Sequence, residues 1–175
     1  DDGWWSCAVI WWTGALLMSF GSTIYRGATL EDLPSLVSLI GKMHEETVWG
    51  GDASFSYIPE KMGSRMRGFI VNQPESFADI AIVDGELVGV LLGDYSGMIF
   101  GDGRQAREKL IYVDDRFRGG MIGPRLMKRF VSWAHTVSAD EIVGGANAGI
   151  HPERTMRLWG KFGLEPFGYT VRARI

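Results

Sequence analysis

The chain has 175 residues, a length that suits one domain with a core large enough to need neither metal ions nor disulfides. Its net charge of −3, without any run of basic residues, gives no reason to expect a nucleic-acid partner. Cys7 is the only cysteine, so no internal disulfide can form, and the histidines have no partner at metal-ligand spacing. We therefore expect a globular domain without a metal site.

The N-terminal segment differs from the rest of the chain in composition. Cys7–Phe20 is almost wholly apolar, yet two aspartates begin the chain where a signal peptide has basic residues. A membrane span needs about 20 apolar residues, and this run is shorter. We interpret residues 1–17 as read-through upstream of a start at Met18, within an N-terminal extension of residues 1–22. The alternative is a hydrophobic anchor that has lost its basic flank.

A strand and two helices are predicted next. Thr23–Ala28 has the pattern of a strand, and Thr29 with Asp32 can form a capping box at the start of a helix. Apolar residues then recur at helical spacing from Leu33 to about Glu46. After a glycine-rich loop, Pro59 is placed to open a second helix that runs through Val71.

A β-hairpin is the clearest local prediction. Phe77–Val83 and Glu86–Gly93 are apolar runs joined by Asp84-Gly85. Asp-Gly at this position indicates a type I′ turn, because both central residues of that turn need a positive φ. We expect Tyr95–Phe100 to continue the second strand after a bulge at Gly97.

A strand, a glycine-rich bend and a helix follow in the next segment. Arg107–Val113 is predicted as the fourth strand, Arg118–Gly123 as the bend, and a helix from Ile122 to about Val137 as the third helix. The first N–H groups of a helix lack partners within it and favour an anion, and glycines let the backbone approach one closely. The bend has neither the P-loop sequence nor the dinucleotide-binding spacing, and by itself it also fits an ordinary tight turn.

The last part of the chain continues the alternation. Glu141–Asn147 is predicted as a fifth strand, Pro152 as the start of a helix that ends at Gly163, and Phe167–Ile175 as the last strand or strands. This order of elements predicts an α/β fold with a mixed, mostly antiparallel sheet.

Three segments, in this order, resemble the GNAT superfamily of acetyl-CoA-dependent N-acyltransferases. They are the Thr23–Leu33 opening, the loop Arg118-x-x-Met121-x-Gly123 and the ending Leu158–Leu164. The family's loop reads Arg/Gln-x-x-Gly-x-Gly/Ala, and its ending reads Leu-Tyr-Glu-Lys-Leu-Gly-Phe. The resemblance covers a domain of residues 23–175.

The resemblance implies a sheet of six to seven strands with about four helices, in which the fourth and fifth strands splay apart to admit acetyl-CoA. Main-chain groups of the fourth strand would pair with the pantetheine arm, the glycine-rich loop would bind the pyrophosphate, and the fifth strand and last helix would form the other wall. The residues so implied are Ile111, Tyr112 and Val113 for the strand, Arg118, Gly119, Gly120, Met121, Ile122 and Gly123 for the loop, and Asn147 and Trp159 for the far wall.

Acyl transfer to an amine needs a base for the ammonium proton and is helped by an acid for the leaving thiolate. Glu108 on the fourth strand is our candidate base, although Arg107 could face inward instead and a solvated charge at a strand end also fits. The family's tyrosine acid is replaced by Trp159, whose indole is not a practical acid. The thiolate could leave unaided, Tyr112 or Tyr169 could serve as the acid, or activity could be lost.

Two positions depart from the family pattern and leave alternatives open. Met121 replaces the middle glycine of the loop, which keeps the backbone N–H but adds a side chain, and Trp159 fits either contact with the thioester or a core position. The leading hypothesis is an acetyl-CoA-dependent N-acetyltransferase that acts on a primary amine of a small molecule or peptide. A non-catalytic CoA-binding domain and a membrane-tethered protein are the alternatives. Resemblance to short bacterial and phage members suggests the cytoplasm, while the acceptor and the oligomeric state, including a homodimer, stay open.

Overall fold

A computed structural model describes residues 22–98 and 101–168. Within them, five strands form a single sheet in the order β1-β2-β3-β4-β5. The strands are β1 Ile24–Gly27, β2 Ser76–Val83, β3 Glu86–Gly97, β4 Arg104–Val113 and β5 Glu141–Val143. The α-helices are α1 Leu33–Glu46, α2 Pro59–Val71, α3 Ile122–Thr136 and α4 Pro152–Gly160.

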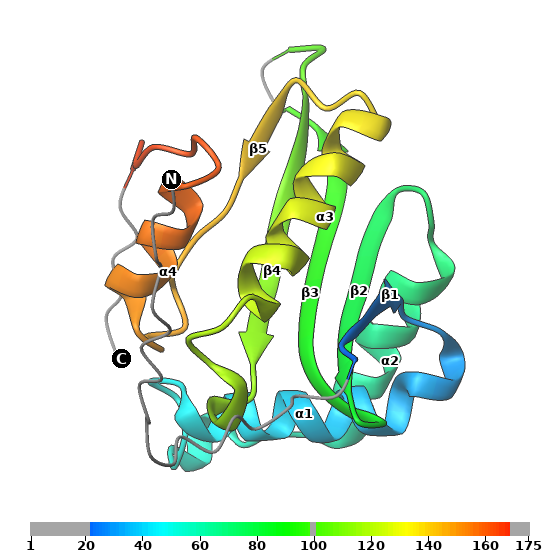
Figure 1. The fold of residues 1–175 in the computed structure, drawn as a ribbon, viewed down its shortest axis with the longest axis vertical. Helices are drawn as coiled ribbons and strands as arrows, with labels where there is room; N and C mark the ends of the chain where they lie inside the picture. Colours follow the sequence, from blue (N-terminus) through cyan, green and yellow to red (C-terminus); the bar gives the residue numbers. More distant parts are fainter. Residues whose placement is uncertain (1–21, 99–100, 169–175) are drawn as a thin grey trace, which may run out of the picture.

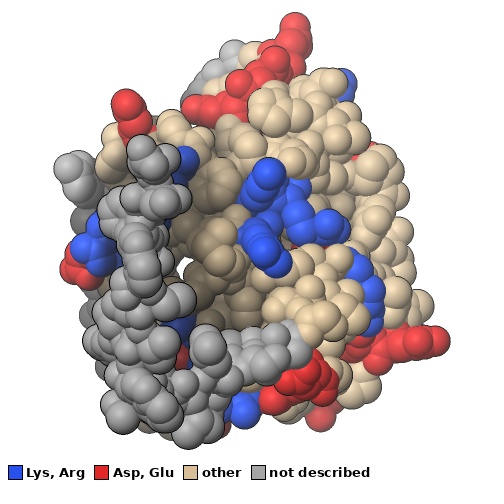
Figure 2. Space-filling view, viewed as in Figure 1, with Lys and Arg blue, Asp and Glu red and all other residues tan. Residues whose placement is uncertain are grey.

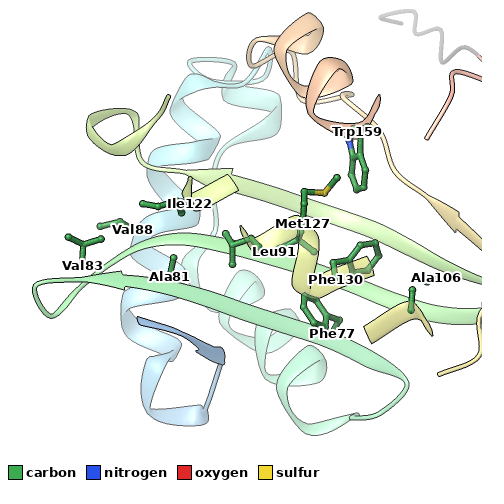
Figure 3. Close-up of a cluster of buried hydrophobic side chains, with 12 residues drawn as sticks. Phe77, Ala81, Val83, Val88, Leu91, Ala106, Ile122, Met127, Phe130 and Trp159 are labelled. Carbon is green, nitrogen blue, oxygen red and sulfur yellow. The ribbon is translucent and has the colours of Figure 1, made fainter. Parts of the chain in front are cut away.

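The sheet is covered on both faces (Figure 1). Alternate residues of β2 and β3 point to opposite sides, as strand geometry requires. Phe77, Ala81 and Leu91 pack with α3, whereas Ala78 and Val90 pack with α1 and α2. Figure 3 shows the α3 side, where the side chains from the sheet, α3 and α4 point toward one another.

Local sequence signals set several of these elements. The carboxylate of Asp32 accepts hydrogen bonds from the backbone N–H of Thr29 at 2.7 Å and from its hydroxyl at 2.9 Å, so the predicted cap is formed. The hairpin turn is also confirmed, since Asp84 and Gly85 have φ values of 50° and 82°. Gly97 pairs with Arg104 in a continuous strand, so the bulge predicted at that glycine is wrong.

The strand count differs from the six to seven predicted. The described residues contain five strands, and β5 ends at Val143 rather than Asn147. Most of the strand predicted at Phe167–Ile175 lies outside the described residues, as do residues 1–21 of the predicted extension. In the described part of the chain, no helix has the length and apolarity needed to cross a membrane.

Strands β4 and β5 separate after a short parallel ladder. Their pairing runs only from Gln105↔Glu141 to Arg107↔Val143, and Figure 1 shows β5 leaving β4 toward α4. On the other side of β4, Gly93 pairs with Glu108 while Leu92 pairs with Leu110, so one extra residue is inserted in β4. Glu108 therefore lies where the two strands part and where β4 is bulged, a place where bulges commonly re-aim a side chain.

Candidate active site

A cleft of about 810 Å³ lies where β4 and β5 diverge. Its lining comes from β4, from the β4–α3 loop, from the β5–α4 segment and from the end of α1 with the residues after it. Figure 2 shows this face of the molecule hollowed between α3 and α4. The cleft thus brings together segments that are far apart in the sequence.

Glu108 lines this cleft at the point of divergence. Its Oε2 accepts a hydrogen bond of 3.2 Å from the backbone N–H of Gly145, so the carboxylate bridges the gap between the two strands. Burial raises the pKa of Glu108 to about 7, although the hydrogen bond from Gly145 and the charge of Lys109 each lower it. A carboxylate with this pKa can take and release a proton near neutral pH.

Tyr112 and Arg118 both contact Glu46, the last residue of α1. The Tyr112 hydroxyl donates to Glu46 Oε1 at 2.5 Å, and burial, followed by this hydrogen bond and the Glu46 charge, raises the pKa of Tyr112 above its ordinary value. Arg118 donates to both oxygens of Glu46, at 2.7 and 2.9 Å, and its Nε donates to the carbonyl of Val113 at 2.7 Å. Neither side chain is therefore directed freely into the cleft.

The glycine-rich loop presents backbone rather than side chains to the cleft. Gly119 has φ +92°, and it lines the cleft together with Gly120 and Gly123. The N–H groups of residues 119–121 have no backbone partner within the described residues, which leaves them available to an anion. Met121 is 61% exposed and the side chain of Ile122 packs in the core, and neither residue is part of the cleft lining.

Asp114 anchors the start of this loop. Its side chain is 3% exposed and accepts hydrogen bonds of 2.9 Å from Lys42 Nζ and from Arg116 Nε. The Arg116 guanidinium and then the Lys42 ammonium hold the pKa of Asp114 well below its usual range, against the effect of burial. The ion pair to Lys42 fastens the loop to α1, the helix that also carries Glu46.

The β5–α4 wall carries the unpaired cations of the cleft. Arg154, Arg157 and Lys161 line it from α4 and the residue after it, and none of the three makes an ion pair within the described residues. A Cβ placed on Gly119 would lie 3.2 Å from Nη2 of Arg154, so this guanidinium rests against the loop. Asn147 lines the same wall. These groups could hold a phosphorylated cofactor, and in the described part of the chain no cluster of metal-ligating side chains is present.

Trp159 is a core residue rather than a lining residue. Its side chain is 2% exposed and packs edge-on against Phe130, with ring centroids 6.5 Å apart. Its indole Nε1 donates to the carbonyl of Gly145 at 3.4 Å. Gly144 has to be small because a Cβ there would collide with the indole ring. Figure 3 shows the indole directed from α4 toward Met127 and the buried cluster.

Most of the site residues predicted from the sequence line the cleft, but three residues of the candidate site were not predicted. The predicted residues that line the cleft are Glu108, Ile111, Tyr112, Val113, Arg118, Gly119, Gly120, Gly123 and Asn147. Glu46 was not anticipated, since it lies 72 residues from Arg118 and no local pattern links the two. Asp114, which accepts hydrogen bonds from Lys42 and Arg116, was not among the predicted site residues either. Arg154 was not predicted either, although the sequence offered a usable signal: it is a cation in the first turn of α4, shortly after the glycine-rich residues 144–149.

Comparisons with known proteins identify the family and the fold of this chain. The model of the Acetyltransferase (GNAT) family matches residues 44–164, well over half of the chain. A predicted acetyltransferase with acetyl-CoA from Clostridium acetobutylicum is 16% identical, with a TM-score of 0.70 over 87% of this chain and 96% of that one. Glucosamine-6-phosphate N-acetyltransferase from Arabidopsis thaliana is 11% identical, with a TM-score of 0.67 over 87% and 98%. Ribosomal-protein-alanine N-acetyltransferase from Brucella melitensis biovar Abortus 2308 is 18% identical, with a TM-score of 0.64 over 88% and 99%. At these identities the likeness shows a shared fold, and no curated protein matches the chain.

Proposed function

This chain belongs to the GNAT acetyltransferase family, and we propose that it transfers the acetyl group of acetyl-CoA to a primary amine of a small molecule or a peptide. The observation that carries the proposal is the position of Glu108. A carboxylate with a pKa of about 7 lines the cleft at the point where β4 and β5 part. Few structural roles need a carboxyl group that titrates there, whereas a general base does.

The residues of the cleft fit acetyl-CoA, which would supply an activated acyl group and several phosphates. The N–H groups of residues 119–121 have no backbone partner, and Arg154 has no ion-pair partner, among the residues that the structure describes, so both suit the pyrophosphate. From Glu108 to Val113, β4 has no strand partner on its β5 side within the described residues, so main-chain groups such as those of Ile111 can pair with an extended arm. The carbonyl of Val113 already accepts from Arg118.

Glu108 would prepare the acceptor amine for attack. A primary amine is mostly protonated near neutral pH and has to lose a proton before it can act as a nucleophile. The Glu108 carboxylate, whose pKa burial raises to about 7, is a stronger base than an exposed carboxylate. The N–H of Gly145 holds one of its oxygens, which fixes the side chain at the divergence of the strands.

Tyr112, the predicted acid candidate that lies in the described residues, is not set to protonate a leaving thiolate, and neither is Trp159, which replaces the family's tyrosine. The Tyr112 hydroxyl hydrogen is directed to Glu46, and the raised pKa of this phenol makes it a weaker acid. The Trp159 indole is buried and donates to a backbone carbonyl. A thiol has a pKa of about 8.5, so a thiolate is a tolerable leaving group near neutral pH. We propose that it departs without an acid from these two residues, and Tyr169 lies outside the described residues.

The test is product formation by the purified chain. Calorimetry with CoA, with ATP as a control nucleotide, measures binding, and incubation with acetyl-CoA and a panel of primary amines measures transfer. We expect micromolar binding selective for CoA and at least one amine product heavier by one acetyl group. Binding without any product would favour a non-catalytic CoA-binding domain, and absence of CoA binding would contradict the proposal.

A further inference from the structure

The C-terminal end of α1 contacts both walls of the cleft. Glu46, the last residue of α1, forms a bidentate ion pair with Arg118 in the middle of the β4–α3 loop. Two residues later, the backbone N–H of Val48 donates to the carbonyl of Ala148 at 3.2 Å, in the β5–α4 segment. The next residue, Gly149, leaves room for the Val48 side chain, which a Cβ there would strike. The divergence of β4 and β5 is thus spanned by one short segment.

The Glu46 carboxylate is fully engaged on the β4 side. Besides Arg118, it accepts the hydroxyl of Tyr112 at 2.5 Å, and Arg118 followed by Tyr112 lowers its pKa. The guanidinium of Arg118 lies 5.0 Å from the centroid of the Tyr112 ring. Every Arg118 nitrogen that can donate therefore has a partner in the protein, which leaves its side chain only 17% exposed.

We propose that Glu46 is a positioning residue of the cofactor site, and this inference rests on the proposed function. Its carboxylate fixes Arg118, and through Arg118 it holds the loop in the conformation that leaves the N–H groups of residues 119–121 without backbone partners within the described residues and so available to an anion. A site that is organised before its ligand arrives loses less conformational freedom on binding. In this arrangement Arg118 acts through the backbone of the loop and not as the cation that meets the phosphates.

The alternative role for Arg118, direct binding of the phosphates, predicts the opposite effect of a Glu46 mutation on CoA binding. If Arg118 were the phosphate-binding cation, Glu46 would compete with the ligand for it, and its negative charge would repel the phosphates. The substitution Glu46→Gln would then free Arg118 and tighten CoA binding. If Glu46 positions the loop, the same substitution weakens binding, because a neutral amide cannot hold a guanidinium through two charged hydrogen bonds.

Calorimetry of CoA binding to the full chain separates these cases. We expect Glu46→Gln to raise the Kd about tenfold, a size typical of losing a charge-assisted hydrogen bond. The control is Glu45→Gln, which makes the same change in net charge at an exposed neighbour and should leave the Kd within about twofold. Arg118→Gln and the double variant should match Glu46→Gln, because the two residues act as one unit. Unchanged or tighter binding by Glu46→Gln would overturn the inference.

A second measurement does not depend on CoA. The N–H groups of Phe117 and Arg118 donate to the carbonyls of Asp114 and Asp115 at 2.9 and 3.3 Å, so amide exchange of this peptide reports the order of the loop. We expect faster exchange there in Glu46→Gln than in the wild type or Glu45→Gln. Equal exchange in all three would contradict the positioning role. Failure of the wild type to bind CoA would contradict the proposed function alone, and the exchange comparison would then decide the role of Glu46.

Discussion

The two walls of the cleft hold their charges in different ways. On the β4 side, the buried or half-buried charges of the loop have partners: Asp114 is paired with Lys42 and Arg116, and Arg118 with Glu46. On the β5–α4 side, the cations at the cleft have no ion-pair partner within the described residues, and Arg154 is the one that rests against the loop. On the β4 wall, ion pairs fix the conformation of the backbone. On the β5–α4 wall, the cations are available to a ligand.

This difference separates structure from recognition. Charges already neutralised within the protein shape a site but add little attraction for a ligand, whereas unpaired cations on a concave surface attract anions over a distance. Glu108 lies between the two walls, because its side chain comes from β4 and its hydrogen-bond partner, Gly145, follows β5. Mutations on the β4 wall should therefore disturb the shape of the site, whereas mutations on the β5–α4 wall should weaken its attraction for an anion.

The largest effect is expected for Glu108→Gln, which removes the proposed base that the walls hold between them. We expect kcat to fall about a hundredfold or more with little change in the Kd for CoA, since general bases contribute on that scale. In the wild type, kcat/KM should rise with pH and level off above about 7, the pKa of Glu108. The glutamine variant should lack this titration. A pH profile that is the same in both proteins would remove Glu108 from catalysis.

The melting temperature of Glu108→Gln shows whether this variant keeps a normal fold. Because the folded pKa of Glu108 is raised to about 7, the native state keeps a proton that the unfolded chain has already lost. The native state therefore loses stability as the pH rises from about 4.5 to 7. Glu108→Gln removes this loss, so its melting temperature at pH 8 should equal or exceed that of the wild type. A lower value would mean that the drop in kcat reflects a damaged fold.

On the β4 wall, Asp114→Asn should cost stability. The amide keeps the shape of the buried side chain but not the charge that Lys42 and Arg116 share, and we expect a loss of about 2 kcal/mol in urea unfolding at pH 7. This value is kept modest because Lys42 and Arg116 are about half exposed, so solvent screens their interaction with Asp114. Because the folded pKa of Asp114 is lowered, its contribution is lost as the pH falls below about 4, and the difference from the wild type should narrow there. Asp115→Asn, at the exposed neighbour, should stay within about 0.5 kcal/mol of the wild type.

Sequence reasoning succeeded where the cause of a structure is local. The Asp84-Gly85 turn has the φ angles that its residues favour, and Pro59 begins α2 as predicted. The Thr29–Asp32 box caps a short 3-10 turn, Leu30–Asp32, that leads directly into α1. It failed where the cause is distant. The run after Glu141 looked like a longer strand, but β5 ends at Val143, and the next residue, Gly144, packs against the indole of Trp159, which comes from a distant helix.

The candidate site followed the same rule. The β4–α3 loop and Glu108 are visible in the sequence because they sit in a contiguous strand–bend–helix pattern, and both line the cleft. Whether Arg118 faces a ligand or a carboxylate depends on where α1 ends relative to the loop, which only the packed structure shows. The position of Trp159 was equally undetermined, since one indole at helical spacing fits a core or a cofactor contact, and its burial beside Phe130 places it in the core.

The smallest predicted effect sharpens the contrast between the walls. Arg154→Gln should raise the Kd for CoA about fivefold, since one cation beside an anion contributes roughly 1 kcal/mol at a partly exposed site. Lys128→Gln, an equal charge change on the exposed face of α3 and outside the cleft lining, is the matched control and should change the Kd less than twofold. Because the contribution of Arg154 is Coulombic, its loss should shrink when the salt concentration rises, whereas the loss from Glu46→Gln should persist. Equal salt dependence for Glu46→Gln and Arg154→Gln would mean that both walls bind the ligand by charge and that the division between them is wrong.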